Sequence, residues 1–327
     1  MNPLTFLRKP LIVIVGPTAS GKSRLALDLA LELGGEIISA DSRLIYRGMN
    51  IGTAKPSDDD LRRVRHHMVD VADPDQSFSV GDYKRRVDEL LIQFDRPGGC
   101  QNVILAGGTG LYIKAVLYGL WNGPPADRKV RDFLVDQEKN SKGFLCRKLT
   151  EVDPVSSTRI HPHDLSKTIR ALEVFYVTGK PLSSFHDLHR FSGANRKFIM
   201  IGLKVKREFL YERINQRVEE MVAKGWVEEV KTLLEKGFHE NLPSMLSLGY
   251  NTLCSCLAGR ISLNHAILLI KRDTRHYAKR QLTWFNKDPN VRWIEYNGDE
   301  PTKGIIHKIQ SLVDQDEYAS FNLTART

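Results

Sequence analysis

The chain has 327 residues, which is enough for two domains or for one large domain that carries an insertion. Its hydrophobic content of 41% and charged content of 27% are ordinary for a globular protein. No apolar run approaches the ~18 residues of a transmembrane helix, and residues 1–9 lack the apolar segment of a secretory signal. We therefore expect a cytoplasmic protein with no membrane partner. The net charge of +9 favours a polyanionic partner instead.

The cysteines give no sign of a zinc site or a disulfide framework. Cys100, Cys146, Cys254 and Cys256 form no C-x-x-C pair and have no histidine at zinc-ligand spacing. We expect reduced thiols.

Short apolar runs alternate with helical patterns along most of the chain. This alternation predicts βαβ units, and hence an α/β fold in which helices flank a parallel sheet. Residues 22–33 carry apolar side chains on one face and predict a helix after the first strand. The expected strands are Leu11–Val15, Glu36–Ala40, Val103–Ala106, Phe198–Val205 and Val291–Tyr296.

Residues 121–197 follow a different pattern. The segment is polar, lacks a clear strand and is broken by several prolines. Its clearest helix covers residues 164–178, with an expected apolar stripe of Leu165, Ile169, Leu172 and Tyr176. We therefore predict a mainly helical insertion domain at 121–197, within a P-loop-type core formed by residues 1–120 and 198–327.

Two later segments predict helices with basic side chains. The first begins at Phe209 and has a stripe of Leu210, Ile214, Val218 and Met221, with Arg213 and Arg217 one turn apart. In the second, Lys271, Arg275 and Lys279 recur every four residues, and Ile267, Ile270, Ala278 and Leu282 form the other side. A solvated basic face and a surface that meets RNA phosphates both fit this spacing.

Residues 16–23 read GPTASGKS and fit the phosphate-binding pattern G-x-x-x-x-G-K-[ST], between an expected strand and an expected helix. Glycines let backbone N–H groups converge on phosphate oxygens at the positive end of the helix. Lys22 adds a charge, and Ser23 can ligate the Mg²⁺ that screens a diphosphate; the alternative is a simple glycine turn. The expected diphosphate-binding residues here are Gly16, Thr18, Ala19, Ser20, Gly21, Lys22 and Ser23, with Mg²⁺ as the cofactor.

This loop does not identify the phosphate compound. Nucleotide hydrolases and kinases usually add a carboxylate at the end of a later strand to hold Mg²⁺. Here the strand at 103–106 runs into Gly107-Gly108-Thr109, and Asp41 follows the second strand instead. A P-loop kinase or phosphotransferase stays as an alternative, weakened by the missing acid.

Several motifs appear in the order and spacing of one family. They are residues 37–56 (IISADSRLIYRGMNIGTAKP), 66–70 (HHMVD), 107–114 (GGTGLYIK), 127–131 (DRKVR), 170–174 (RALEV), 249–250 (GY) and 274–285 (TRHYAKRQLTWF). On these motifs the chain resembles the tRNA dimethylallyltransferases, in their bacterial form without a zinc finger, over most of its length.

The resemblance implies transfer of a dimethylallyl group from dimethylallyl diphosphate to the N6 amine of the adenine immediately 3′ of the anticodon in tRNA. It makes Asp41 the general base and gives Thr109 a contact with the oxygen that bridges the allyl carbon and the diphosphate, while Arg217 joins the diphosphate site. It also implies a channel in which the substrates meet, and a partner in the tRNA anticodon stem-loop; we expect a monomer. The tRNA-binding positions are Asp41, Ser42, Arg43, Leu44, Arg131, Ser166, Lys167, Arg170, Arg275, Lys279, Arg280, Gln281 and Trp284.

Three tRNA-facing positions depart from the family pattern, which usually has Gln where Leu44 stands and Gln-Arg where Ser166-Lys167 stand. A paralogue with altered tRNA preference is therefore one alternative. An adenylate isopentenyltransferase that acts on a free nucleotide is another, although it would not need the basic and aromatic residues at 271–287. A non-catalytic RNA-binding protein is a third, against which the intact phosphate loop argues.

Overall fold

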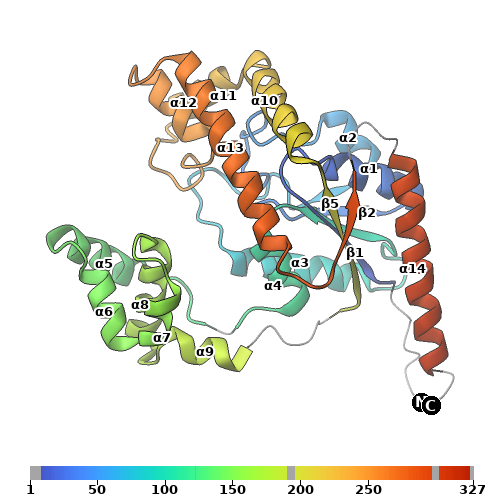
Figure 1. The fold of residues 1–327 in the computed structure, drawn as a ribbon, viewed down its shortest axis with the longest axis horizontal. Coiled ribbons are helices and arrows are strands. Elements are labelled where there is room, and N and C mark those ends of the chain that lie inside the picture. The colour runs from blue at the N-terminus through green and yellow to red at the C-terminus, as the bar shows by residue number, and fades with distance from the viewer. Residues whose placement is uncertain (1–8, 122, 190–195, 297–301, 325–327) are drawn as a thin grey trace. The chain divides into compact units, whose positions relative to one another are not determined.

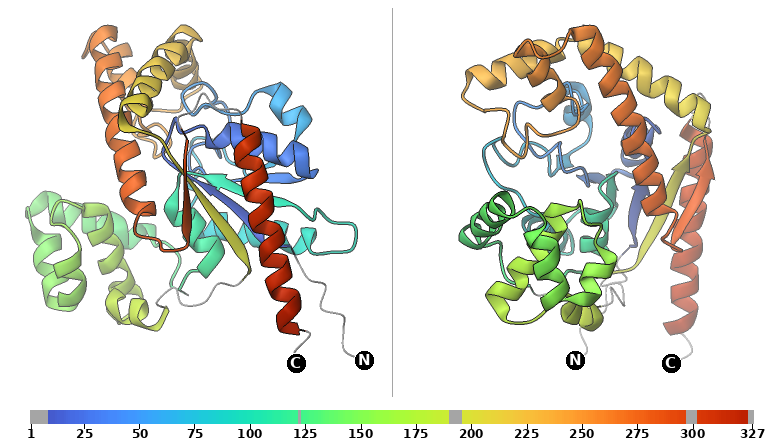
Figure 2. Two further views of the ribbon diagram at one scale, coloured as in Figure 1. Left: turned by 45° about the vertical axis from the view of Figure 1, so that its right-hand side comes forward. Right: turned by 60° about the vertical axis from the view of Figure 1, so that its left-hand side comes forward.

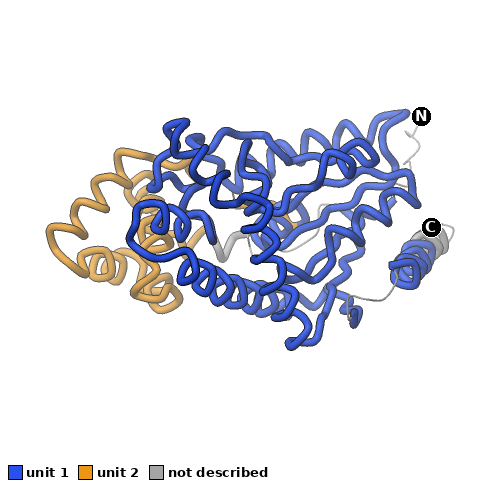
Figure 3. The backbone as a smooth tube through the Cα atoms, turned by 90° about the horizontal axis from the view of Figure 1, so that it is seen from above, with its two compact units in different colours: residues 1–117, 195–327 blue, residues 118–194 orange. Residues whose placement is uncertain are grey.

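The computed structural model describes residues 9–121, 123–189, 196–296 and 302–324. The chain divides into two compact units, distinguished by colour in Figure 3: residues 1–117 with 195–327, and residues 118–194. These limits lie a few residues before the domain boundaries that the sequence predicts. Each unit contains a hydrophobic core of its own.

A parallel sheet forms the centre of the first unit (Figure 1). Neighbouring strands pair in the order β3-β2-β4-β1-β5-β6, and every pairing is parallel. The strands are β1 (Leu11–Val15), β2 (Glu36–Ser39), β3 (His66–His67), β4 (Val103–Gly107), β5 (Phe198–Lys204) and β6 (Val291–Glu295). The predicted α/β fold is confirmed, and five strands end within a residue of the prediction. The short edge strand β3 is the exception, because two residues leave no apolar run in the sequence.

The helices of the first unit lie on both faces of this sheet and beside it. They are α1 (Lys22–Leu33), α2 (Asp58–Arg63), α3 (Val80–Phe94), α4 (Gly110–Tyr118), α10 (Arg207–Ala223), α11 (Trp226–Glu235), α12 (Tyr250–Leu257), α13 (Leu263–Phe285) and α14 (Thr302–Thr324). On one face, α1 and α14 pack over β1 and β5 around a core that includes Leu25 and Ile305 (Figure 2). Right-handed crossovers place α3 and α4 on the opposite face. There Tyr83 stacks on Tyr112 and donates to the Ser39 carbonyl oxygen at 2.8 Å.

The first helix has the bounds that the sequence predicts. Gly21 and Gly34 flank it, and both adopt left-handed backbone angles that suit glycine. Leu25, Leu29 and Ala30 of its apolar face are buried. None of the helices in the described part of the chain is both long and apolar enough to cross a bilayer.

Helices α10 to α13 form a second core beside the sheet. Buried residues from all four contribute, among them Val218, Trp226, Leu253 and Ile270. The predicted stripe of α10 is buried as far as Val218, with Met221 partly buried, although the helix starts two residues before Phe209. This arrangement lays α13 alongside α10 (Figure 1).

The second unit is helical, as its sequence predicts. Its helices are α5 (Arg128–Asn140), α6 (Phe144–Val152), α7 (Pro154–Arg159), α8 (Leu165–Thr178) and α9 (Leu182–His189). The stripe predicted for α8 is wrong at its two ends, because Leu165 and Tyr176 are exposed. The buried face of α8 instead includes Ala171, Leu172 and Glu173.

The buried carboxylate of Glu173 explains this rotation. Its oxygens accept hydrogen bonds from the Asp127 N–H at 2.7 Å, from the Arg131 guanidinium at 2.7 and 3.0 Å, and from Arg170. Burial alone would raise the pKa of Glu173, but these hydrogen bonds lower it overall. A buried charge is tolerated only when paired in this way, so Glu173 ties α5 to α8.

We expect Glu173→Gln to lower the free energy of opening of the second unit by about 2–3 kcal/mol at neutral pH. This is less than the loss expected for a fully buried ion pair, because both arginines are partly exposed. Hydrogen exchange of the α5 and α8 amides measures this change. Because the folded-state pKa of Glu173 is below its ordinary value, the difference should disappear as the pH falls through that pKa. The exposed Glu151→Gln serves as the control; equal exchange in the two variants would contradict the role of Glu173.

Candidate active site

Three neighbouring strands end at one place. Because β4 lies between β2 and β1 in a parallel sheet, their carboxyl ends bring together Asp41, Thr109 and the loop that begins at Gly16. The Thr109 N–H donates to the Ala40 carbonyl oxygen at 3.0 Å. The approach is so close that a Cβ atom on Gly107 would lie 2.1 Å from that same oxygen.

The loop at residues 16–21 is shaped to present its backbone. Ala19 and Gly21 have positive φ angles of 63° and 90°, and Gly21 caps α1 without a side-chain hydrogen bond. The first N–H groups of α1 therefore face the pocket with the positive end of the helix dipole. Ser20 is fully buried, and its hydroxyl has no partner among the described residues. This geometry suits an anion with several oxygens.

Two cations and one carboxylate determine the electrostatics. Burial lowers the pKa of Lys22 to about 8, with Asp41 opposing the shift and Arg217 adding to it. Burial also lowers the pKa of Arg217, against the attraction of Asp41 and Glu220. The Lys22 amine donates to the Pro17 carbonyl oxygen at 3.2 Å. Two cations at such close quarters are stabilised by a bound polyanion, which a diphosphate supplies.

Lys22, Ser23, Asp41 and Arg217 line one small pocket of about 90 Å³, so the structure brings these predicted residues together. Its remaining wall is partly apolar and includes Ala26, Ile37, Leu44 and Ala106. The charged end of this cavity suits a diphosphate and its apolar end suits a short prenyl chain.

A larger pocket of about 520 Å³ adjoins the first, and Asp41, Arg217 and Tyr277 line both. This volume is typical of pockets that bind small molecules. Ser42, Arg43 and Arg280 also line it, three of the positions predicted to contact tRNA. The larger pocket therefore gives an acceptor a route to Asp41.

Two hydrogen bonds orient the groups between the pockets. The Ser42 N–H donates to the Thr109 hydroxyl oxygen at 3.1 Å, and the Arg43 N–H donates to one Asp41 carboxylate oxygen at 2.8 Å. Burial, followed by the nearby Asp41 charge, raises the pKa of Tyr277 to about 12, so this phenol is neutral at physiological pH. Asp41 and Thr109 thus have fixed orientations at the same position.

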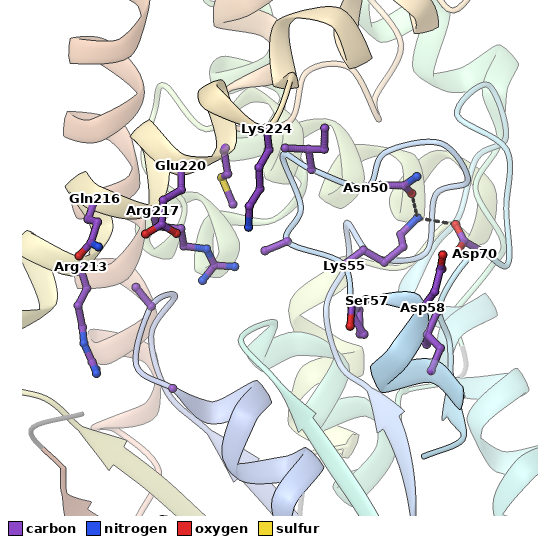
Figure 4. Close-up of a pocket in the computed structure, with 17 residues that line it drawn as sticks. Asn50, Lys55, Ser57, Asp58, Asp70, Arg213, Gln216, Arg217, Glu220 and Lys224 are labelled. Carbon is purple, nitrogen blue, oxygen red and sulfur yellow. Dashed lines mark hydrogen bonds and ion pairs between the residues drawn. The ribbon is translucent and has the colours of Figure 1, made fainter. Parts of the chain in front are cut away.

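A third pocket, of about 760 Å³, also has Arg217 in its wall (Figure 4). Arg217 and Glu220 extend into it from α10, Lys224 extends into it from the residue after that helix, and Lys55 lies opposite. The Lys55 amine is almost fully buried, where it donates to the Asp70 carboxylate, to the Asn50 side chain and to the Tyr46 carbonyl oxygen. Arg217 lines all three pockets. The loop at residues 50–56 also borders all three, through Ala54 in the third pocket, Thr53 in the larger one and both residues in the small one.

The loop at residues 50–56 is held in place from α11. One carboxylate, Glu229, accepts hydrogen bonds from the N–H groups of Asn50 at 2.8 Å, Ile51 at 2.7 Å and Gly52 at 3.3 Å. It also accepts the Tyr250 hydroxyl at 2.6 Å. The Trp226 ring covers Gly52 so closely that a Cβ atom there would lie 2.0 Å from the indole nitrogen. Glu229 was not predicted from the sequence, because nothing local to it indicates its partners.

The predicted tRNA-binding residues of α13 have different environments. Lys279, Arg280 and Trp284 are exposed, and the Lys114 amine lies 5.5 Å from the Trp284 ring centroid. Arg275 is half-buried and donates to the Asn215 side chain at 2.7 Å. Gln281 is buried and directs both of its amide groups into the protein.

Four more predicted positions lie in the second unit. Ser166 and Lys167 are exposed in the first turn of α8. Arg131 and Arg170 are both paired with Glu173, which leaves part of each guanidinium at the surface.

Comparisons with known proteins give the same picture. The model of the family described as IPP transferase matches residues 44–288. A tRNA dimethylallyltransferase of Geobacter metallireducens is 48% identical over 88% of this chain and 93% of its own length, and one of Pelotomaculum thermopropionicum is 42% identical over 92% and 96%. The crystal structure of a tRNA isopentenylpyrophosphate transferase from Bacillus halodurans aligns with a TM-score of 0.70 at 35% identity, covering 96% of this chain and all of that one. A eukaryotic dimethylallyltransferase acting on tRNA aligns with a TM-score of 0.73 at 26% identity, over 88% and 74%.

A phosphate loop, a carboxylate and a threonine hydroxyl thus meet at the ends of three adjacent strands, in a chain that a single family model matches over most of its length. The protein belongs to the IPP transferase family, together with the tRNA dimethylallyltransferases.

Proposed function

We propose that this protein transfers a dimethylallyl group from dimethylallyl diphosphate to the N6 amine of the adenine immediately 3′ of the anticodon in tRNA, and releases diphosphate. The observation that carries the proposal is the grouping of Asp41, Lys22 and Arg217 around one pocket, with the Thr109 hydroxyl held next to Asp41 by the Ser42 N–H. The family membership of the chain supports the same reaction.

The reaction forms a C–N bond at the allylic carbon and breaks the bond from that carbon to the bridging diphosphate oxygen. The adenine amine becomes acidic only as the new bond forms, and the Asp41 carboxylate then accepts its proton. The electron pair of the breaking bond passes to the bridging oxygen. The Thr109 hydroxyl donates to that oxygen, while Lys22, Arg217 and the loop N–H groups stabilise the growing charge of the diphosphate.

The residues at the diphosphate site also fit the expected Mg²⁺. Mg²⁺ prefers oxygen ligands and is usually held by few protein groups together with phosphate oxygens and water. Within the described residues no cluster of three His, Cys, Asp or Glu side chains could hold a metal alone, but Ser23 lines the pocket beside Lys22. Ser23 would ligate the ion, which supplies additional charge neutralisation for the diphosphate.

The tRNA anticodon stem-loop would meet Ser42, Arg43 and the exposed cations of α13 in the first unit, and Arg131, Ser166, Lys167 and Arg170 in the second. Exposed lysines and arginines contact phosphates and position an RNA without reading its sequence. The net charge of +9 suits such a partner. We further propose that the protein acts as a cytoplasmic monomer, which light scattering tests against the chain mass of 37.2 kDa.

The alternatives are less well supported. A kinase or phosphotransferase would use a carboxylate after a later strand, whereas β4 continues into Gly107-Gly108-Thr109. An adenylate isopentenyltransferase would have no use for the exposed cations of α13. The relatives compared above are named for tRNA and not for a free nucleotide.

An acceptor comparison tests the reaction directly. We expect purified protein to transfer label from dimethylallyl diphosphate to tRNA, to transfer little to AMP, and to hydrolyse no ATP. Nuclease digestion and chromatography of the labelled product identify the modified base. Preferred transfer to AMP would support the free-nucleotide alternative, and rapid ATP hydrolysis would revive the kinase.

Asp41→Asn should lower the single-turnover rate by about 10²–10⁴-fold, the usual cost of losing a general base. Because the amide has nearly the same shape, tRNA affinity and folding should be retained. Asp75→Asn, an exposed change on a loop outside the pockets, is the matched control. A rate for Asp41→Asn equal to that of the control would remove Asp41 from the base role.

Lys22 should make diphosphate binding pH-dependent. Its pKa of about 8 means that the amine is charged below that pH and loses its proton as the pH rises through 8, so affinity for inorganic diphosphate should fall by up to about tenfold per pH unit above it. Titration calorimetry of wild-type protein and Lys22→Met isolates this contribution from the ionisation of diphosphate itself. Parallel pH profiles for the two proteins would be evidence against it.

A further inference from the structure

Gln281 connects two loops that are far apart in sequence. From α13 its side-chain oxygen accepts the Thr18 N–H at 2.8 Å, and its side-chain NH₂ donates to the Gly108 carbonyl oxygen at 3.0 Å. The residue is buried, with 6% of its surface exposed. Both functional groups of one amide are therefore used inside the protein, one on the phosphate loop and one on the loop that carries Thr109.

The packing around this amide leaves no freedom. A Cβ atom on Gly108 would lie 2.1 Å from the Gln281 nitrogen, so glycine at this position lets the amide reach the backbone. Ala278 and Phe285, one turn before and after on α13, are also buried and hold the helix against the core. The amide is thus a rigid link whose length sets the separation of the two loops.

That separation matters for the reaction. The phosphate loop holds the diphosphate, and Thr109 must reach the oxygen that bridges the diphosphate and the allyl carbon. An error of about 1 Å in such an arrangement can cost about 10²-fold in rate.

We infer that Gln281 is a positioning residue that fixes the phosphate loop and the Gly107–Gly110 loop relative to each other, so that the diphosphate and the Thr109 hydroxyl meet at the leaving oxygen. The inference rests on the proposed prenyl transfer. This positioning role takes the place of the direct tRNA contact predicted for Gln281, because its amide is buried and already makes two hydrogen bonds inside the protein.

Two substitutions test the link. Gln281→Glu keeps an acceptor for Thr18 but sets a carboxylate oxygen against the Gly108 carbonyl oxygen, and Gln281→Met keeps the volume while losing both hydrogen bonds. We expect kcat at saturating tRNA to fall about 10²-fold in each, with no change in tRNA affinity. Gln101→Glu makes the same change at an exposed residue just before β4 begins, far along the strand from Gly108, and should leave kcat unchanged. Arg280→Ala provides the reference for a lost tRNA contact.

The Gln281→Glu variant adds a readout that a purely structural role would not move. Burial against a carbonyl oxygen raises the pKa of the introduced carboxyl, and its protonated form again donates a hydrogen bond. The ratio of variant to wild-type kcat should therefore rise as the pH falls from about 8 to about 6. Unchanged kcat, or a loss confined to tRNA affinity as in Arg280→Ala, would overturn the inference.

Hydrogen exchange separates this inference from the proposed function. If wild-type protein transfers no prenyl group, the proposed function fails, but Gln281→Met should still accelerate exchange in a peptide that contains Thr18, because that amide loses its acceptor. Exchange equal to wild type in that peptide would overturn the positioning role on its own.

Discussion

The site depends on the contact between the ends of β2 and β4. The Thr109 N–H donates to the Ala40 carbonyl oxygen, the Ser42 N–H returns a hydrogen bond to the Thr109 hydroxyl, and Gly107 leaves room for the two backbones to meet. With β1 on the other side of β4, the Asp41 carboxylate and the phosphate loop line one pocket, and the Ser42 N–H holds the Thr109 hydroxyl next to them. The remaining helices support this arrangement or bring further groups to it.

Burial of two cations makes the site favourable for an anion. Lys22 and Arg217 are both held in a partly buried position, where burial works against their protonated forms, and Asp41 is the acid near both. In the proposed reaction, a diphosphate would supply the negative charge that these cations favour, and Asp41 would be left to accept a proton. The cost of burying the two cations in the free protein would then favour binding of the leaving group, which gains charge as the reaction proceeds.

Much of the core could be predicted from sequence because its signals are local. The apolar face of residues 22–33 predicted the bounds of α1, and buried strands such as β1 appear as unbroken apolar runs. The two-residue strand β3 gives no such run. On α8, the buried face includes the charged Glu173, so a stripe predicted from apolar residues alone lies on the wrong side of the helix at its two ends. The two bonds of Gln281 link positions 263 and 173 residues apart, beyond the reach of any periodicity. Its place near Ala278 and Leu282 on the apolar side of α13 was the available signal.

The hydrogen bonds from the backbone of residues 50–52 to Glu229 limit how segments could be exchanged between related proteins. The shape of that loop, which borders the pockets, is determined by a helix that begins at Trp226, and Trp226 itself occupies the space that a side chain at Gly52 would need. The loop and α11 therefore form one structural unit despite their separation in sequence. A chimeric chain would have to take both segments from the same parent, whereas the exposed face of α14 could be exchanged with far less constraint.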